Sequence, residues 1–234
     1  QYLDSANRAL RFMQDNMWRD NKFLATSKNG KTHLNAYLDD YAYMLLAIIE
    51  YLQCRWDNNL LDWAGKIADA LLTNFEDKTH GGFFFTSHDH EQLIQRLKTF
   101  SDDAIPSGNG IATLALQRLG LLLGKSDYLV AAERCLQTAA THINQHAVLH
   151  CSLLNALEEY LNPPVIIILR GDNNEIRNWQ KEIDRHYLPR TLCFAIASDI
   201  KLENLLAEKQ PMPNTCAYIC EGTTCLPPVT SFDN

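Results

Sequence analysis

Hydrophobic positions in the first 160 residues repeat with helical spacing and form two kinds of segment. In the first kind, apolar residues recur every three or four positions with polar residues between them, at about 1–17, 58–74 and 126–142. This spacing is typical of amphipathic helices that cover a core with one face. The second kind is apolar on most sides: Leu38–Leu52, Gly108–Leu123 and Ala147–Leu161. These segments are predicted to be helices buried between layers.

The two kinds of helix alternate, and the connections between them differ in length. The links from a buried helix to the next amphipathic one, near Arg55–Asn59 and Gly124–Ser126, have only a few residues, as in antiparallel helix hairpins. The opposite links, Trp18–Tyr37 and Phe75–Pro106, are long, and loops of that length are usually functional. Three such hairpins are half of the six in a closed (α/α)6 toroid. We expect the other half to precede Gln1 in a longer protein.

The pattern changes at Pro163-Pro164, where short apolar runs begin to alternate with helical segments. Strands are predicted at Val165–Leu169, Thr191–Ala197 and Cys216–Cys220, and helices at about 174–187 and 201–208. Strands that alternate with helices indicate a small parallel α/β unit. The sequence therefore predicts a mainly α fold, with half of an (α/α)6 toroid at 1–162 and a small α/β unit at 163–234.

Composition and charge exclude several classes of protein. Hydrophobic residues make up 46% of the 234 positions, which is enough for a large core. The net charge of −7 argues against nucleic acid as a partner, because phosphate binding requires a basic patch. No apolar run approaches the roughly 18–20 residues of a membrane span, so no membrane partner is expected. Seven cysteines, an odd number scattered over apolar positions, favour a reducing compartment, and we expect a cytoplasmic protein.

Two pairs of aspartates are the first candidates for chemistry. Asp39-Asp40 and Asp102-Asp103 both precede buried helices and stand 63 positions apart, about one repeat. In a toroid this spacing predicts four carboxylates around one mouth, where like charges raise one pKa and create an acid and a base. Glycoside hydrolysis uses such a pair. The alternative is helix capping, since aspartate is favoured at helix N-termini.

The long segment before the second buried helix carries candidate binding residues. Gly81-Gly82 permits a tight turn and Phe83-Phe84-Phe85 resembles a short strand, which predicts a β-hairpin at the rim. One phenylalanine, Phe84, could stack on a sugar ring, although the aromatic rings could equally fill the gap between helices. Arg96 could clamp an anionic group or form an ordinary surface pair.

Histidine and cysteine offer weaker candidates. His88-Asp89-His90 contains a His-x-His pair without a third ligand at a suitable spacing, so we expect neither a metal nor a cofactor. Near the end of the chain, Cys220 and Cys225 could form a close thiol pair across a turn, and a redox role for them competes with structural burial. Neither belongs to a Cys-x-x-Cys motif.

Several motifs together resemble one family of proteins. They are Tyr37-Leu38-Asp39-Asp40-Tyr41-Ala42, Gly81-Gly82-Phe83-Phe84, Leu93-Ile94-x-Arg96-x-Lys98, Asp103-Ala104-x-Pro106-Ser107-Gly108-Asn109 and the terminal Ala217-Tyr218-Ile219-Cys220 with Cys225-Leu226-Pro227-Pro228. In this order they look like the YyaL family, also called spermatogenesis-associated, thioredoxin-domain-containing proteins. The resemblance implies a thioredoxin-like N-terminal domain as partner, followed by a toroid similar to N-acylglucosamine 2-epimerases and six-hairpin glycosidases.

Two functions follow from these observations. The first is a carbohydrate-active toroid, epimerase- or glycosidase-like, in which Asp39, Asp40, Asp102 and Asp103 are the candidate acids and bases. In that hypothesis a sugar ligand contacts residues beside them, namely Tyr41, Phe84, Arg96, Ser107 and Asn109. The second is a non-catalytic module that binds a protein or peptide client for the attached thioredoxin-like domain.

Overall fold

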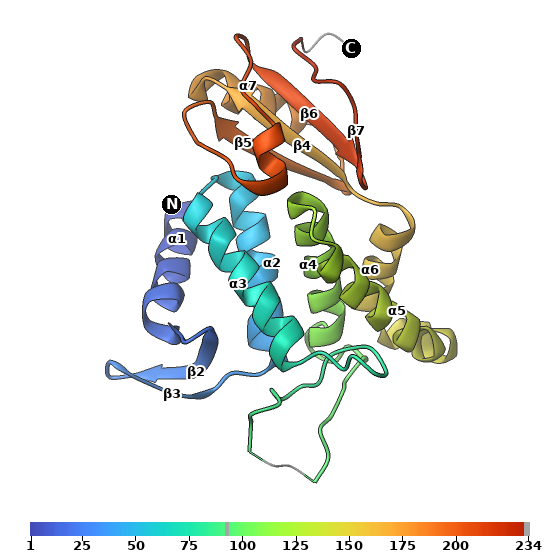
Figure 1. Cartoon of the computed structure of the whole chain (residues 1–234). Helices are drawn as coiled ribbons and strands as arrows, with labels where there is room; N and C mark the ends of the chain where they lie inside the picture. The colour runs from blue at the N-terminus through green and yellow to red at the C-terminus, as the bar shows by residue number, and fades with distance from the viewer. Residues whose placement is uncertain (92–93, 232–234) are drawn as a thin grey trace.

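The computed structural model describes residues 1–91 and 94–231, so Leu93 of the Leu-Ile-x-Arg-x-Lys motif lies outside the described residues. A group of helices forms the larger part of the molecule and a small sheet covers one end of it (Figure 1). The main helices are α1 (Tyr2–Phe12), α2 (Leu38–Cys54), α3 (Asn58–Asn74), α4 (Gly108–Leu123), α5 (Ser126–His146), α6 (Cys151–Leu161) and α7 (Asn173–Ile183). The predicted mainly α fold, with helix hairpins followed by a small sheet, is confirmed.

The helix bounds follow local sequence signals closely. The observed α3 and α4 begin and end where the hydrophobic pattern predicts. Asp57 caps α3 by accepting a hydrogen bond from the Asn59 amide (2.9 Å), and the Ser107 hydroxyl caps α4 by accepting one from Gly110 (3.1 Å). Gly124 ends α4 with a left-handed φ of 67°, which allows the tight turn into α5.

Two predicted helices differ from the observed ones at one end. The segment predicted at 1–17 is α-helical only to Phe12, and Met13–Met17 continue it as a π-helical turn. The segment predicted to begin at Ala147 starts with a short 3-10 turn, Ala147–Leu149, before α6. In both cases the apolar spacing continues across the change in helix type, so the spacing alone does not reveal that change.

The link between α1 and α2 contains a small sheet that the hydrophobic pattern did not predict. Strands β1 (Trp18–Arg19), β2 (Lys22–Lys28) and β3 (Lys31–Asn35) pair antiparallel in sequence order. Their connections are two-residue turns, Asp20-Asn21 and Asn29-Gly30, in which every residue has a positive φ. Asn-Gly is the strongest short-range sequence signal for such a hairpin, so this part was detectable from sequence.

The second sheet has the strand order β5-β4-β6-β7 and corrects the expectation of a purely parallel unit. Its strands are β4 (Val165–Gly171), β5 (Thr191–Ala197), β6 (Cys216–Glu221) and β7 (Thr224–Cys225). Helix α7 crosses over between β4 and β5, and these two strands are parallel. Between β5 and β6 the chain forms only a 3-10 turn, Asn204–Glu208, and β6 pairs antiparallel with β4. A parallel strand needs a full crossover, which this link does not provide.

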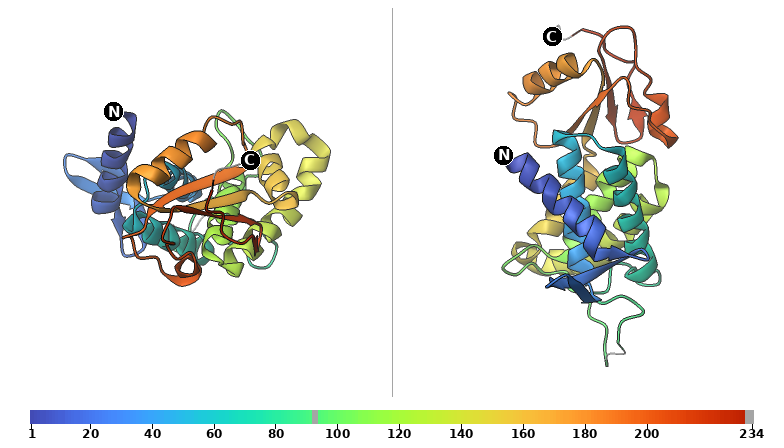
Figure 2. Two further views of the ribbon diagram at one scale, coloured as in Figure 1. Left: turned by 90° about the horizontal axis from the view of Figure 1, so that it is seen from above. Right: turned by 90° about the vertical axis from the view of Figure 1, so that its left-hand side faces the viewer.

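One hydrophobic core runs from the helices into the sheet. It joins Leu45 and Leu116 of the inner helices to Ile168 and Phe194 of the sheet, all of them buried. The Trp56 and Phe194 rings meet edge to face at 5.6 Å between centroids, across the junction. The two further views show the sheet seated on the helix ends (Figure 2). Because the core is continuous, the division into two domains near residue 162 stays a prediction.

None of the helices in residues 1–91 and 94–231 has both the length and the apolar composition that crossing a membrane requires.

Candidate functional site

The inner helices α2, α4 and α6 begin at the end of the molecule that lies opposite the sheet. Both long links, 18–37 and 75–107, lie at that end (Figure 1). The Tyr43 hydroxyl of α2 donates to the Pro106 carbonyl just before α4 (2.8 Å). Ser107 and Ser152, at the starts of α4 and α6, have their hydroxyl oxygens 3.2 Å apart. The three helix N-termini therefore meet, and we call this end of the molecule the rim.

Asp102 ties two of these helices together. Its carboxylate accepts hydrogen bonds from the Ser107 amide (2.8 Å), the Ser152 amide (2.8 Å) and the Ser152 hydroxyl. Burial raises the pKa of this carboxyl, but the hydrogen bonds from Ser152 and Ser107 outweigh it and hold the pKa below its ordinary value. Asp102 is therefore an ionised cap shared by α4 and α6.

Asp39 lies against the start of α4 in a different environment. A Cβ atom on Gly108 would stand 2.1 Å from the Asp39 carboxylate, so only glycine leaves room for this side chain. Burial, and then the charge of Asp40, raise the pKa of Asp39 above its ordinary value. Burial and the charges of Asp39 and Asp102 also raise the pKa of Tyr43. One carboxylate from each predicted pair therefore acts on the same tyrosine.

The second member of each pair turns elsewhere. Asp40 folds back to accept a hydrogen bond from the Tyr37 amide (2.8 Å) and caps α2. Asp103 is exposed, and its carboxylate has no hydrogen bond or ion pair with any other described residue. The four carboxylates thus have four different environments: Asp40 and Asp102 hold backbone amides, Asp39 is half-buried, and Asp103 is free.

Three of the residues expected to contact a ligand are buried inside the protein. Tyr41 is 2% exposed and its hydroxyl accepts a hydrogen bond from the Phe23 amide (2.8 Å). Asn109 is fully buried and exchanges hydrogen bonds with the Phe83 backbone (2.7 and 2.9 Å) and donates to Thr99 (3.0 Å). Ser107 is buried as the cap of α4. Their polar groups make hydrogen bonds within the protein, and contact of these residues with a sugar stays a prediction.

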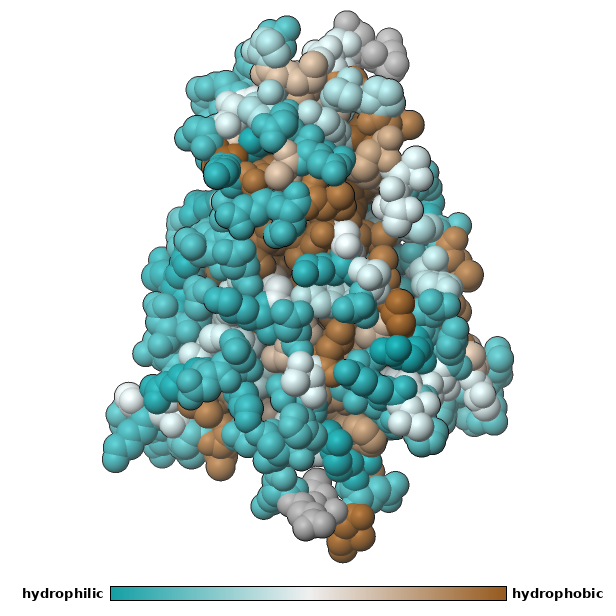
Figure 3. All heavy atoms as spheres, viewed as in Figure 1, coloured by the Kyte–Doolittle hydropathy of each residue, from teal (hydrophilic) through white to brown (hydrophobic). Residues whose placement is uncertain are grey.

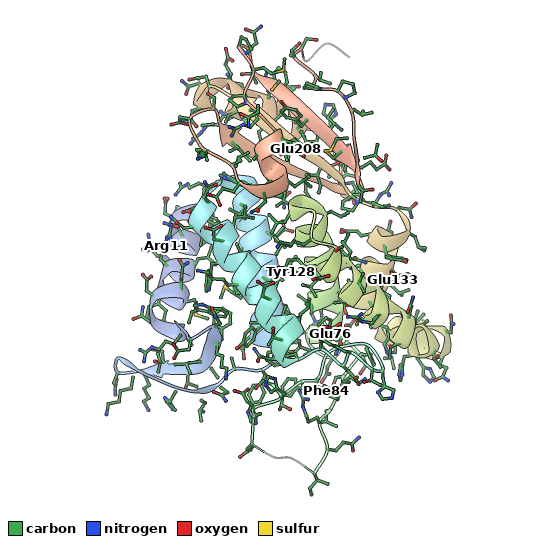
Figure 4. All side chains as sticks on the ribbon, in the orientation of Figure 1. Arg11, Glu76, Phe84, Tyr128, Glu133 and Glu208 are labelled. Atoms are coloured by element: carbon green, nitrogen blue, oxygen red, sulfur yellow. A yellow bond between two sulfur atoms is a disulfide. The ribbon has the colours of Figure 1, made fainter. Side chains whose placement is uncertain are left out.

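The aromatic segment forms no hairpin, because Glu76 and Phe83 make only an isolated bridge. Phe83 is fully buried, while Phe84 and Phe85 are half-buried. The Arg96 guanidinium stacks on the Phe84 ring at 4.0 Å from its centroid and also donates to the Thr86 carbonyl. Arg96 therefore covers one face of the ring that was expected to stack on a sugar. Phe84 lies at the rim, at the other end of the molecule from Glu208 (Figure 4).

Lys98 also holds the segment that contains Phe83 and Phe84 in place. Its ammonium binds the Asp77 carboxylate (2.8 Å) and the Gly81 carbonyl (3.0 Å). Burial opposes ionisation of Asp77, but Lys98 and the amides of His80 and Thr79 outweigh it and hold the pKa of Asp77 well below its usual range. The segment is thus held in place by charged groups as well as by Asn109.

Cys220 and Cys225 lie far from the rim, in the sheet. They face each other in β6 and β7 and form a disulfide. The expected closeness of the pair across a turn is therefore confirmed, and its redox role stays a prediction. Of the other cysteines, Cys135, Cys193 and Cys216 are buried.

Sequence reasoning missed three residues of the rim. Tyr43 stands four positions after Asp39, on the same helix face, which is a sequence signal for their closeness, although Tyr43 lies within an apolar run. Ser152 had no distinguishing motif, since it is reached by Asp102 from 50 positions away. Gly108 begins a helix, as its sequence context predicts, and its missing side chain also makes room for Asp39.

Comparisons with known proteins agree with the family resemblance. The chain is 23% identical to human spermatogenesis-associated protein 20 and 30% identical to the mouse protein, in each case over 83% of its length. It is 24% identical to an uncharacterised protein of Caenorhabditis elegans over 99% of its length. The chain spans 26% of each mammalian relative and 33% of the nematode one. No family model matches it.

A solved structure supports the toroid. A GH76 alpha-mannanase from Bacteroides thetaiotaomicron matches with a TM-score of 0.52 and 17% sequence identity. The match covers 68% of this chain and 45% of the mannanase chain. At this identity the likeness concerns the fold alone, and a match to just under half of a six-hairpin enzyme agrees with three helix hairpins.

Proposed function

We propose that this homologue of spermatogenesis-associated protein 20 binds a carbohydrate at the rim and acts on it with two of the rim carboxylates. These two carboxylates are Asp39 and Asp103. The observation that carries the proposal is that both lie at the rim in contrasting environments: Asp39 is half-buried against the start of α4 and has a raised pKa, whereas Asp103 is exposed. The likeness of the fold to an alpha-mannanase supports a sugar as the ligand class.

The different environments of the carboxylates give them different roles. Asp39 has a raised pKa, so it keeps its proton to a higher pH than an ordinary aspartate and suits a general acid. Asp103 is exposed and unpaired among the described residues, which suits a base or a group that binds sugar hydroxyls. Asp102 and Asp40 are positioning residues, because their oxygens hold backbone amides. The Tyr43 hydroxyl lies near Asp39, the proposed general acid.

Substitution at the rim tests the proposal. Thermal unfolding of the protein is followed with mannose, glucose, N-acetylglucosamine and their disaccharides, and the reaction mixtures are analysed for hydrolysis or epimerisation. We expect one sugar to raise the melting temperature of the wild type. Asp39→Asn should retain that binding and lose turnover by at least about 100-fold, as for removal of a general acid. Asp103→Asn should weaken both.

The matched control is Asp62→Asn, which removes an exposed carboxylate of α3. It should behave as the wild type. The proposal is wrong if no sugar shifts the melting temperature, or if Asp62→Asn and Asp39→Asn have the same effect. A further variant, Gly108→Ala, tests geometry: the added methyl displaces the Asp39 carboxylate, so turnover should fall while the Asp39 side chain is still present.

A second candidate function is the binding of a protein or peptide client. It is favoured by exposed apolar side chains in the link 75–107, which lies at the rim. Ile94, Leu97 and Ile105 are exposed there, Leu97 and Ile105 to 58% and 57%. Exposed apolar side chains that gather on one surface are typical of protein contacts. The client of an attached thioredoxin-like domain would be such a partner.

One comparison separates the two functions. In pull-downs, client binding should be lost in Leu97→Ser and in Phe84→Ala but kept in Asp39→Asn. Loss of binding in the aspartate variant alone would contradict the client hypothesis. Sugar-dependent stabilisation that survives Leu97→Ser would favour the carbohydrate hypothesis.

A further inference from the structure

A cavity of about 370 Å³ lies at the other end of the molecule, between the helices and the sheet. It is lined by the end of α4, the start of α5, strand β4 and the 3-10 turn Asn204–Glu208. Its walls are mostly apolar, with Leu122, Leu129, Ile166, Ile168 and Leu205 among them. Hydrophobic side chains gather along this junction on the face seen in Figure 3. The volume falls within the range of sites for small organic molecules.

The Cys220–Cys225 disulfide forms part of the cavity wall. Both cysteines and both residues of the connecting turn, Gly222 and Thr223, line it. Cys220 is nearly buried, at 7% exposed, while Cys225 is exposed. A molecule inside the cavity would therefore lie beside the two cysteines of the disulfide.

A cation stands beside one of these sulfur atoms. The Lys209 ammonium lies 3.2 Å from Cys225 Sγ and 5.5 Å from the centroid of the Tyr218 ring. The Lys209 amide is fixed by a hydrogen bond to the Leu206 carbonyl (3.0 Å), so the 3-10 turn positions the side chain. The neighbouring Glu208 also lines the cavity, and the charged group that contacts the sulfur is the Lys209 ammonium. A cation at a sulfur atom stabilises its thiolate form.

We propose that Cys220–Cys225 is a thiol–disulfide exchange site for a low-molecular-weight thiol with an apolar body, which enters this cavity, and that Lys209 stabilises the departing Cys225 thiolate. This function goes beyond the carbohydrate proposal and depends on different residues at the opposite end of the molecule. It combines three independent observations: a disulfide, a cavity that reaches it, and a cation at one sulfur.

The exchange proceeds in two balanced steps. The thiolate of the entering compound attacks Cys220 Sγ, the disulfide breaks, and its electron pair leaves on Cys225 Sγ beside Lys209. This gives a mixed disulfide at Cys220 and a free thiolate at Cys225. A second molecule of the thiol displaces Cys220 and releases the compound as its disulfide, so two thiols are oxidised and one protein disulfide is reduced. The reverse sequence reduces a small disulfide.

The rate of reduction tests the role of Lys209. The protein is treated with phenylmethanethiol or with 2-mercaptoethanol, and freed cysteines are alkylated and identified by mass spectrometry. Lys209→Met should slow reduction roughly three-fold, because a departing thiolate that loses its cation has a higher pKa and leaves more slowly. Lys209→Arg keeps the charge and should react as the wild type. Lys201→Met is the matched control, since Lys201 is an exposed lysine that does not line this cavity.

The choice of thiol tests entry into the cavity. Phenylmethanethiol should show saturation and a higher rate constant per thiolate than 2-mercaptoethanol. Leu205→Trp, at the cavity edge, should remove that advantage and leave the reaction with 2-mercaptoethanol unchanged. The proposal is overturned if both thiols react alike, if Lys209→Met equals the wild type, or if only a protein dithiol reduces the bond. Alkylation of Cys220 and Cys225 without any reductant would also overturn it.

Discussion

Removal of the Asp102 side chain provides the sharpest test of how the rim is held together. Its carboxylate accepts three hydrogen bonds, two from backbone amides and one from a hydroxyl, and serves as cap for α4 and α6 at once. Loss of one capping side chain costs about 1 kcal/mol, and a hydrogen bond to a charged group contributes about 1.5–3 kcal/mol. Because the three bonds share one carboxylate, we expect Asp102→Ala to lower the free energy of unfolding by about 3 kcal/mol.

Thermal unfolding at pH 7, followed by circular dichroism, measures this loss. For a chain of this size each kcal/mol shifts the melting temperature by about 2–4 °C, so about 3 kcal/mol corresponds to a decrease of about 6–12 °C. Asp102→Asn keeps an acceptor oxygen but loses the charge, and its decrease should be smaller. Asp103→Ala is the matched control, and because this neighbour is exposed its change should stay within about 0.5 kcal/mol.

The pH dependence separates the charge of Asp102 from its shape. The pKa of this carboxyl is lowered in the folded protein, so its contribution is fully present above its ordinary pKa of 3.8 and is lost as pH falls through the folded value. The wild type and Asp102→Asn should therefore differ in stability above about pH 4, and the difference should shrink as pH falls below 3.8 and vanish once pH is below the lowered folded pKa. Equal melting temperatures for Asp102→Ala and Asp103→Ala at pH 7 would refute the shared-cap interpretation.

Three further changes test other parts of the structure. Asp39→Asn should leave the free energy of unfolding at pH 7 unchanged or raise it. The reason is that a raised pKa means the charged carboxylate is less stable in the folded protein than in the unfolded chain. A melting temperature well below that of the wild type would contradict this. Asn109→Leu leaves the Phe83 amide without its partner in the core, so the free energy of unfolding in urea should fall by about 2–4 kcal/mol. Proteolysis within 75–107 should become faster, and unchanged proteolysis would show that Asn109 does not hold this segment. Gly110→Ala would bring a Cβ atom within 2.0 Å of Ser152 Oγ, so it should cost about 1–3 kcal/mol, and a neutral effect would mean that α4 and α6 do not approach so closely.

The helices could be predicted from sequence because their signals are local. The apolar spacing of α3 and α4, the Asp57 and Ser107 caps and the Gly124 stop all lie within a few residues of what they determine. The small sheet at 18–35 has an equally local signal in Asn29-Gly30, which helical spacing does not reveal. The direction of β6 had no local signal, because it depends on how the chain returns after β5.

The sequence by itself determined that aspartate pairs precede two buried helices and that two cysteines flank a turn near its end. Only the tertiary structure decided which aspartate of each pair faces the inner helices, since Asp102 is fixed by Ser152 and Asp39 by the space that Gly108 leaves. Likewise, only the folded chain brings Lys209 to Cys225 and places an apolar cavity beside them. Spacing along a chain determines which face of a helix or strand a residue occupies. The charge, burial and hydrogen bonding of that residue come from segments distant in sequence, and these decide its chemistry.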